Sequence, residues 1–238
     1  MSLREQKHRI REQVWALLVR EKVARPPFPI RGRIPNFVGA EKAAENLLQL
    51  GPFRSARTVK VSPDSPQRPV RELCLRLGKK LVMPTPRLRE GFLLLEPSKI
   101  SEHNYRHAST IRGGYTFGEK VEPESLDIID FIVVGSVAVS RGGARVGKGE
   151  GYSEIEYALL RMLGRVSEDT PVTTTVHPLQ IVGEIPVEEF DVPVDYIVTE
   201  LGVVVTNTMF SRPRGIIWRL LSNEKMGEIP LLRRFKQT

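Results

Sequence analysis

The sequence has one cysteine, Cys74, and four histidines among its 238 residues. One cysteine excludes an intrachain disulfide and a zinc site built from cysteines. Cys74 lies in an apolar helical pattern, which predicts a small buried side chain. The spacing of His103, His107 and His177 is not that of metal ligands, so we predict structural or surface roles for them. The sequence shows neither a Cys/His nor a Ser/His/Asp arrangement for nucleophilic catalysis.

Long hydrophobic runs are also missing. No stretch approaches the roughly 20 apolar residues that span a bilayer, and the longest run, residues 128–139, is interrupted by Asp130, Gly135 and Ser136. We interpret this run as one buried strand. Residues 1–11 are charged and lead into an amphipathic pattern instead of the apolar core of a secretory signal. The sequence therefore predicts a cytoplasmic protein with no membrane partner.

The composition is that of an ordinary folded protein. Charged residues make up 27% of the chain and hydrophobic residues 40%, close to the averages of globular domains. Because no linker, internal repeat or low-complexity tract is evident, we predict a single domain over residues 1–238. The net charge of +8 suits a polyanionic ligand such as a nucleotide, a polyglutamylated cofactor or RNA, and solubility alone explains it as well.

Helical and β-rich segments alternate along the chain. Apolar residues at helical spacing predict helices over residues 3–23, 39–50, 69–77 and 153–163. β-rich runs predict strands at residues 58–61, 80–83, 92–95, 128–139, 172–176, 196–199 and 203–206. This order predicts an α/β protein with a mostly parallel sheet covered on both faces. Ligands bind beyond the carboxyl ends of strands in such sheets, and a glycine-rich segment follows the run at 128–139.

That glycine-rich segment, residues 145–152, predicts a phosphate site. Gly147, Gly149 and Gly151 free the backbone to bring amide groups close to an anion, and Arg145 and Lys148 add positive charge. The helix that follows directs its N-terminal amides to the same place. The segment matches neither the P-loop nor the dinucleotide-binding fingerprint. The alternative is a flexible loop that caps a helix.

The same residues carry a resemblance to a known family. Arg145-x-Gly147-x-Gly149-x-Gly151-Tyr152 resembles the R-x-G-x-G-x-G-Y-Y-D signature of 5-formyltetrahydrofolate cyclo-ligase, and the apolar segment 135–139 resembles the strand that precedes it there. Residues 34–37, 83–88 and 147–151 are similar to the divergent branch of methenyltetrahydrofolate synthetase domain-containing proteins. The resemblance spans nearly the whole chain. It implies a three-layer α/β/α fold of the NagB/RpiA/CoA-transferase-like type.

The resemblance also implies a nucleotide site. Lys7 and Arg11 reproduce the family's K-x-x-x-R spacing, whose basic residues lie near the ATP phosphates, although a solvated basic helix face has the same spacing. We predict Lys148 and Arg145 as the catalytic residues, which neutralise phosphate charge. The predicted nucleotide-binding residues are Lys7, Arg11, Arg145, Gly147, Lys148, Gly149, Glu150, Gly151 and Tyr152.

On the substrate side, Asp191-x-Pro193-x-Asp195 is similar to the family's D-x-P-x-D run. We predict that Asp195 binds substrate and that Asp191 is a turn or capping residue. Arg87, with its neighbour Arg89, is predicted to pair with the carboxylates of a folate tail, because guanidinium groups bind carboxylates in a bidentate fork.

Two departures from the family pattern bear on catalysis. Tyr152-Ser153-Glu154 replaces Tyr-Tyr-Asp, in which the aspartate is associated with Mg²⁺, so we predict Glu154 as the metal ligand. The substrate-site glutamate that follows the first central strand of the family is replaced by the segment 62–66. Either Asp64 substitutes for that glutamate or the pterin site is absent.

The resemblance implies an ATP- and Mg²⁺-dependent conversion of 5-formyltetrahydrofolate to 5,10-methenyltetrahydrofolate. The formyl oxygen attacks the γ-phosphorus, and ring closure expels phosphate. Two alternatives stay open: an ATP-binding enzyme of this fold with a non-folate substrate, and an RNA-binding or interaction module without catalysis. Basic clusters at 31/33, 87/89, 212/214 and 233–236 suit the module, but aromatic residues make up only 7% of the chain and no RNA-binding signature is present.

Overall fold

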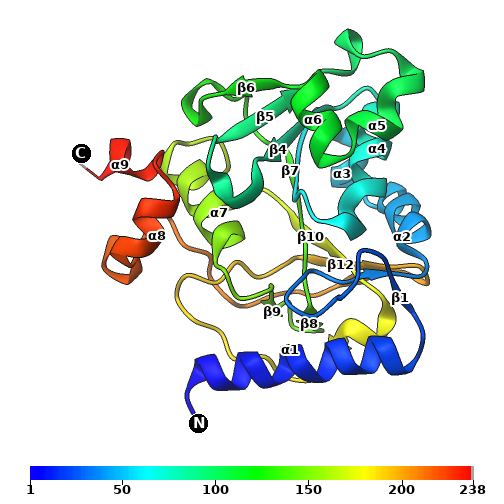
Figure 1. Cartoon of the computed structure of the whole chain (residues 1–238), viewed down its shortest axis with the longest axis vertical. Helices are drawn as coiled ribbons and strands as arrows, with labels where there is room; N and C mark the ends of the chain where they lie inside the picture. The colour runs from blue at the N-terminus through cyan, green and yellow to red at the C-terminus, as the bar shows by residue number, and fades with distance from the viewer. Residues whose placement is uncertain (237–238) are drawn as a thin grey trace.

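The computed structural model describes residues 1–236, and an eight-stranded sheet forms its centre (Figure 1). The strand order across this sheet is β13-β12-β10-β7-β3-β4-β5-β6. The strands in chain order are β3 (Thr58–Val61), β4 (Lys80–Pro84), β5 (Phe92–Leu95), β6 (Glu119–Val121), β7 (Phe131–Val134), β10 (Val172–Thr175), β12 (Tyr196–Thr199) and β13 (Gly202–Val205).

The five inner strands are parallel. β12, β10, β7, β3 and β4 pair in the same direction, so their carboxyl ends gather at one end of the sheet. The outer strands β13, β5 and β6 run antiparallel to their neighbours. β4 and β5 are joined directly by a short loop, which is too short for the crossover that a parallel pair needs. The sheet is mostly parallel, as the sequence predicts.

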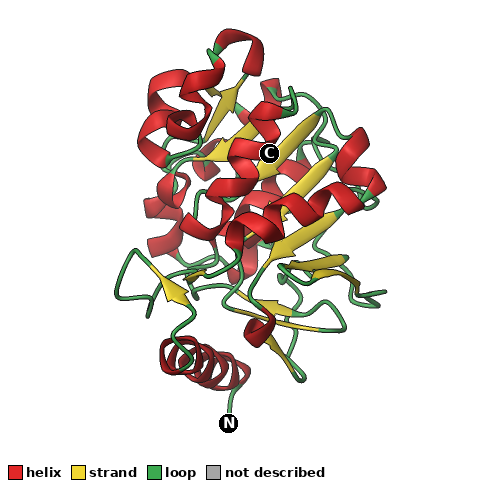
Figure 2. Cartoon of the chain, turned by 90° about the vertical axis from the view of Figure 1, so that its right-hand side faces the viewer, coloured by secondary structure: helices red, strands yellow, loops and turns green. Residues whose placement is uncertain are grey.

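Alternate residues of the strands pack on opposite faces of the sheet. On β7, Phe131 and Val133 belong to one hydrophobic cluster, whereas Ile132 and Val134 belong to another. Helices pack on both faces of the sheet (Figure 2). The first layer contains α2 (Ala40–Asn46), α3 (Gly51–Ser55), α4 (Arg68–Arg76), α5 (Tyr105–Ala108) and α6 (Ile111–Phe117), and the second contains α7 (Tyr152–Met162) and α9 (Leu232–Phe235). α8 (Asn223–Glu228) contacts the start of α7, where Glu228 accepts a hydrogen bond from the Tyr152 hydroxyl. The protein is thus a three-layer α/β/α structure.

The N-terminal helix lies at one end of these layers. α1 (Leu3–Arg20) starts at a capping box formed by Ser2 and Glu5 and buries Val14, Trp15 and Leu18 against a three-stranded sheet. That sheet has the order β11-β8-β9. The remaining strands are β8 (Ala138–Ser140), β9 (Arg145–Val146) and β11 (Ile181–Val182), with a separate pair formed by β1 (Ala24–Arg25) and β2 (Asn36–Phe37). This packing places α1 beside the glycine-rich segment, residues 145–152, which begins with β9.

Most predicted elements are present within a few residues of their predicted bounds. The predicted helices correspond to α1, to α2 with the short 3-10 turn that follows it, to α4 and to α7. Cys74 is fully buried in the layer formed by α2 to α6, and burial raises the pKa of its thiol to about 12. No helix within residues 1–236 is long and apolar enough to cross a membrane.

The prediction of one strand over residues 128–139 is wrong. The segment forms β7 and β8, which belong to different sheets. Between them the backbone leaves the large sheet, and the carbonyls of Ser136 and Val137 accept hydrogen bonds from the Gln180 side chain at 2.9 and 3.1 Å. Gly135 and Ser136 mark the break locally, but the partner of the freed carbonyls, Gln180, is 44 residues from Ser136 in sequence.

Candidate functional site

A cavity of about 420 Å³ opens where α1 meets the glycine-rich segment. Four parts of the chain form its walls: α1, the segment from β9 into α7, the loop before β12, and the segment before α8. Asp64, which follows β3, and Ile34 complete the lining. The charged lining residues are Arg4, Lys7, Arg11, Asp64, Arg145, Lys148, Glu150, Glu154, Glu188, Asp191 and Lys225.

The backbone of the glycine-rich segment has the geometry of an anion site. Gly149 and Gly151 adopt φ values of +100° and +75°, which residues with side chains rarely adopt. Gly151 is the N-cap of α7, and no side chain from residues 1–236 caps this helix. The first amides of α7 are therefore available to a bound anion, and the helix dipole favours negative charge at this point.

Arg11 on α1 contacts the glycine-rich segment directly. Its Nε donates a hydrogen bond to the carbonyl oxygen of Gly147 at 2.7 Å, and its guanidinium carbon lies 3.4 Å from where a Cβ of residue 149 would be. Burial lowers the pKa of Arg11, while the charges of Glu154, Asp191 and Glu188 act in the opposite direction. Arg11 makes no ion pair with residues 1–236, so its charge can serve a ligand.

Lys7, one turn before Arg11, is placed differently. It is buried, and its Nζ lies 2.7 Å from Glu188 and 2.6 Å from Asp191. Asp191 also accepts a hydrogen bond from the backbone N–H of Glu188 at 2.7 Å, as expected of a turn-capping residue. Lys7 thus ties α1 to the loop before β12, and its charge is balanced within the protein.

Arg145 and Glu154 form a largely buried ion pair next to the glycine-rich segment. Arg145 Nη2 donates to Glu154 at 2.5 Å, and its other nitrogens donate to the carbonyls of Val192 and Gly135. Arg145 thus connects β9, the start of α7 and the loop before β12. Its charge is balanced by Glu154, so the structure favours a positioning role for both residues.

Lys148 lies at the rim, about one third exposed, and pairs with Glu150 at 2.8 Å. Burial lowers the pKa of Lys148, but the hydrogen bond to Glu150 and the charge of Asp64 outweigh it, and the net shift is upward. Because an exposed ion pair is weak, a bound phosphate can compete with Glu150 for Lys148.

Asp64 faces the other side of the cavity. Its Oδ2 and the Oε1 of Gln67 both lie 3.0 Å from the position of an added Cβ on Gly135. Gln67 is fully buried, and its Oε1 has no partner among residues 1–236. Burial raises the pKa of Asp64, against the opposing charge of Lys148. Of these two acceptor groups, only the Asp64 carboxyl lines the cavity, where it can accept N–H donors of a ligand.

A buried ion pair near Asp64 was not predicted from the sequence. Lys60 on β3 donates to Glu156 on α7, with exposed side-chain fractions of only 1% and 5%. Burial raises the pKa of Glu156, and Lys60 opposes the shift. Two sequence features could have indicated the pair. One is a lysine within a four-residue buried strand, and the other is a glutamate on the apolar face of a helix.

The segment that leads into α8 and includes its first residues, 213–225, forms a largely apolar wall of the cavity. We name it the C-terminal strap. Its residues that line the cavity are Pro213, Gly215, Ile216, Ile217, Leu220, Leu221, Ser222 and Lys225. Local sequence does not indicate this role, because the part of the strap before α8 is irregular apart from one 3-10 turn, Trp218–Leu220.

All nine predicted nucleotide-binding residues line the cavity, as do Asp64 and Glu154. Arg87 and Asp195 do not. Arg87 lies exposed in the loop between β4 and β5. Asp195 lies at the amino ends of β10 and β12, where it accepts a hydrogen bond from the Val172 amide at 2.8 Å and pairs with Arg212 at 2.7 Å. Asp195 thus lies at the opposite end of the sheet from the cavity, whereas Arg87 follows the carboxyl end of β4 without lining the cavity.

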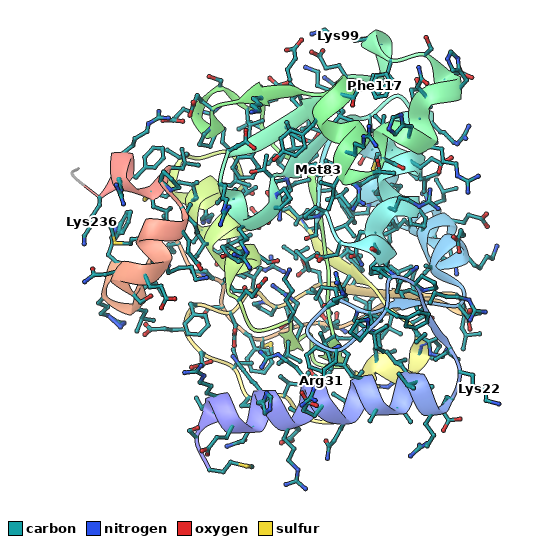
Figure 3. All side chains as sticks on the ribbon, in the orientation of Figure 1. Lys22, Arg31, Met83, Lys99, Phe117 and Lys236 are labelled. Carbon is teal, nitrogen blue, oxygen red and sulfur yellow. The ribbon has the colours of Figure 1, made fainter. Side chains whose placement is uncertain are left out.

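The predicted basic clusters do not form one surface. Arg31 pairs with Glu12 on α1, and Figure 3 shows it far from Lys236 at the other end of the chain. Arg212 is held by Asp195, and Arg234 pairs with Glu122 and Glu124. Within residues 1–236, these three arginines are thus paired with carboxylates of the protein itself, which weakens the case for an RNA-binding surface.

Comparison with known proteins adds an independent observation. The sequence model of the 5-formyltetrahydrofolate cyclo-ligase family matches residues 3–200. The methenyltetrahydrofolate synthase domain-containing proteins of Bos taurus and Mus musculus are 42% and 43% identical to this chain over 231 and 235 residues. The matches cover 95% and 97% of this chain but 61% and 63% of those proteins, so the chain spans about three fifths of their length.

The fold has a counterpart among solved structures. The NMR structure of Aquifex aeolicus 5,10-methenyltetrahydrofolate synthetase superposes with a TM-score of 0.51 at 24% identity, covering 86% of this chain and 95% of that one. At this identity the likeness concerns the fold alone. Together with the sequence matches, it confirms the predicted resemblance and the predicted fold class.

Proposed function

Because the chain belongs to the 5-formyltetrahydrofolate cyclo-ligase family, we propose that it binds ATP at the glycine-rich segment and uses it, with Mg²⁺, to convert 5-formyltetrahydrofolate to 5,10-methenyltetrahydrofolate. One observation carries the proposal. The positive-φ glycines 149 and 151, the uncapped start of α7 and the unpaired Arg11 all face one cavity. This combination suits a polyphosphate.

The residues that line the cavity would have different roles in binding ATP. The amides of the glycine-rich segment and of α7 bind phosphate oxygens, and Arg11 and Lys148 balance their charge. Arg145 holds the segment in place through Glu154. Bound ATP supplies the phosphoryl group that activates the formyl oxygen, so the protein's contribution is to bind, orient and exclude water.

The acidic residues fit a magnesium ion held mainly by phosphate and water. No group of three or more His, Cys, Asp or Glu side chains in residues 1–236 forms a ready metal site. Mg²⁺ usually takes one or two carboxylates together with substrate phosphates, and the cavity offers Glu154 and Asp64. Glu154 would have to share its carboxylate between Mg²⁺ and Arg145.

On the substrate side we propose that Asp64 binds the ring of the reduced folate. A carboxyl group that lines the cavity can accept the N–H groups of a 2-amino-4-oxopyrimidine edge. An ATP-dependent enzyme with a non-folate substrate is the second candidate. The position of Arg87 and Asp195 outside the cavity favours it, because only Asp64 is left of the three predicted folate contacts. The single domain and the cytoplasmic location stay predictions.

Calorimetric titration with ATP and Mg²⁺ tests the nucleotide site. We expect binding to the wild type, and binding weaker by about tenfold or more for Arg11→Met, because one charge-assisted phosphate contact is lost. Arg9→Met on the same helix is the control, since Arg9 is exposed and does not line the cavity. Equal affinities in the two variants, or no binding at millimolar ATP, contradict the proposed site.

Methenyltetrahydrofolate absorbance tests the reaction. With 5-formyltetrahydrofolate, ATP and Mg²⁺ we expect absorbance to rise with the wild type and to stay flat with Asp64→Ala. A flat trace for a wild type that binds ATP rejects the folate substrate and leaves the second candidate.

A further inference from the structure

The C-terminal strap, residues 213–225, contributes to the cavity from outside the part of the chain that the family model matches. That match ends at residue 200. The match to the mouse relative covers 97% of the chain, so the strap lies within it. The strap is therefore an addition to the family's shared region that is present in this branch.

Contacts at several points hold the strap against the site. Arg219 forms a two-point ion pair with Glu189, at 2.9 and 2.5 Å, next to the loop that binds Lys7. At its end, Lys225 lies 4.1 Å from the centre of the Tyr152 ring and pairs with Glu228, which also accepts the Tyr152 hydroxyl at 2.8 Å. Tyr152 is the first residue of α7. The strap is thus attached to the phosphate-binding end of that helix.

Most residues by which the strap lines the cavity are apolar, the exceptions being Ser222 and Lys225, and two of the apolar side chains lie outside the core. Ile216 and Leu221 line the cavity and also pack on the hydrophobic cluster around α7. Ile217 and Leu220 line the cavity but belong to none of the hydrophobic clusters of residues 1–236, and Leu220 is 47% exposed. Exposed apolar side chains beside a polar phosphate site are typical of a surface for the apolar part of a ligand.

We propose that the strap binds the planar base of the nucleotide whose phosphates the glycine-rich segment holds. The inference rests on the proposed ATP site. The phosphate-binding backbone and the apolar wall line the same cavity, and a nucleotide carries both an anionic chain and a flat ring. A residue in the strap therefore contributes to the affinity for the base and leaves the affinity for the phosphates unchanged.

Titrations with two ligands test this division. ATP and inorganic tripolyphosphate, each with Mg²⁺, are titrated into the wild type and into Ile217→Ser/Leu220→Ser. We expect ATP to bind the variant about tenfold more weakly and tripolyphosphate to bind both proteins equally, because only the base loses apolar contact. The control is Ile128→Ser/Leu201→Ser, which removes an isoleucine and a leucine that are 56% and 81% exposed away from the cavity. The control should bind both ligands as the wild type does.

The possible results separate the two proposals. If the wild type binds ATP and the strap variant binds it equally well, the strap inference is wrong and the nucleotide site stands. If the variant loses affinity for both ligands in the same proportion, the strap acts through the glycine-rich segment, and the inference is again wrong. If the wild type binds neither ligand, the nucleotide site itself is rejected, and the strap inference is rejected with it. Thermal unfolding of each variant shows that any loss of affinity comes from a folded protein.

Discussion

The buried ion pair between Lys60 and Glu156 allows a demanding test of how the site is supported. Lys60 comes from the central strand β3 and Glu156 from the second turn of α7. The pair therefore attaches α7, whose first residues belong to the proposed phosphate site, to the middle of the sheet. Glu156→Gln keeps the size of the side chain and removes its charge. Lys60 then stays buried without a counter-charge.

The exposed fractions set the magnitude. With 1% of Lys60 and 5% of Glu156 exposed, solvent cannot replace the lost partner. Breaking such a pair costs about 3–5 kcal/mol of unfolding free energy. For a protein of this size, 1 kcal/mol corresponds to roughly 2–4 °C, so the melting temperature should fall by about 6–20 °C.

Urea and thermal denaturation at neutral pH measure this loss. Glu45→Gln is the control, because Lys42 and Glu45 form an ion pair at 3.1 Å in which both side chains are 61% exposed. The control should lose at most about 0.5 kcal/mol. Replacing both buried partners, as Lys60→Met/Glu156→Leu, should restore much of the stability, since no charge is then left buried. A loss below about 1 kcal/mol for Glu156→Gln, or a double variant less stable than the single one, would refute the reasoning.

Three further predictions concern the cavity. Gly149→Val should abolish ATP binding in calorimetry while costing about 1–2 kcal/mol of stability, because residue 149 has a φ of +100° and the new side chain would approach Arg11; unchanged ATP affinity contradicts the site. Asp64→Asn should raise the unfolding free energy at pH 7. Burial raises the pKa of Asp64 above its ordinary 3.8, so the carboxyl ionises more readily in the unfolded chain, and the folded state loses stability as pH rises past 3.8. The gain should therefore vanish below pH 3.8, and urea titrations that show the same gain at every pH would disprove it. Gly135→Ala should destabilise the protein by about 1–3 kcal/mol in the same titrations, because its Cβ would lie 3.0 Å from Asp64 and Gln67; wild-type stability would show that both side chains move freely.

Local sequence predicted those features that depend on neighbours along the chain. The strand 58–61 and the helix around residues 68–76 were found because their apolar residues have the right spacing. The break between β7 and β8 was missed because the partner of the carbonyls freed there, Gln180, is 44 residues from Ser136 in sequence. Asp195 was placed with the substrate by its motif, yet its position at the amino end of β12 directs it to Arg212. A motif identifies residue types, whereas the direction of the strand decides which end of the sheet they occupy.

The sequence by itself determined the layered α/β class, the glycine-rich segment and the family, because each depends on residue spacing or on a contiguous motif. Only the tertiary structure decided which charges serve a ligand. Lys7 and Arg11 are equivalent in sequence, but Lys7 meets Glu188, which is 181 residues away, whereas Arg11 meets only a backbone carbonyl. The same holds for Lys60 and for the C-terminal strap. Ion pairs and cavity walls join distant segments, so their partners appear only when the chain has folded.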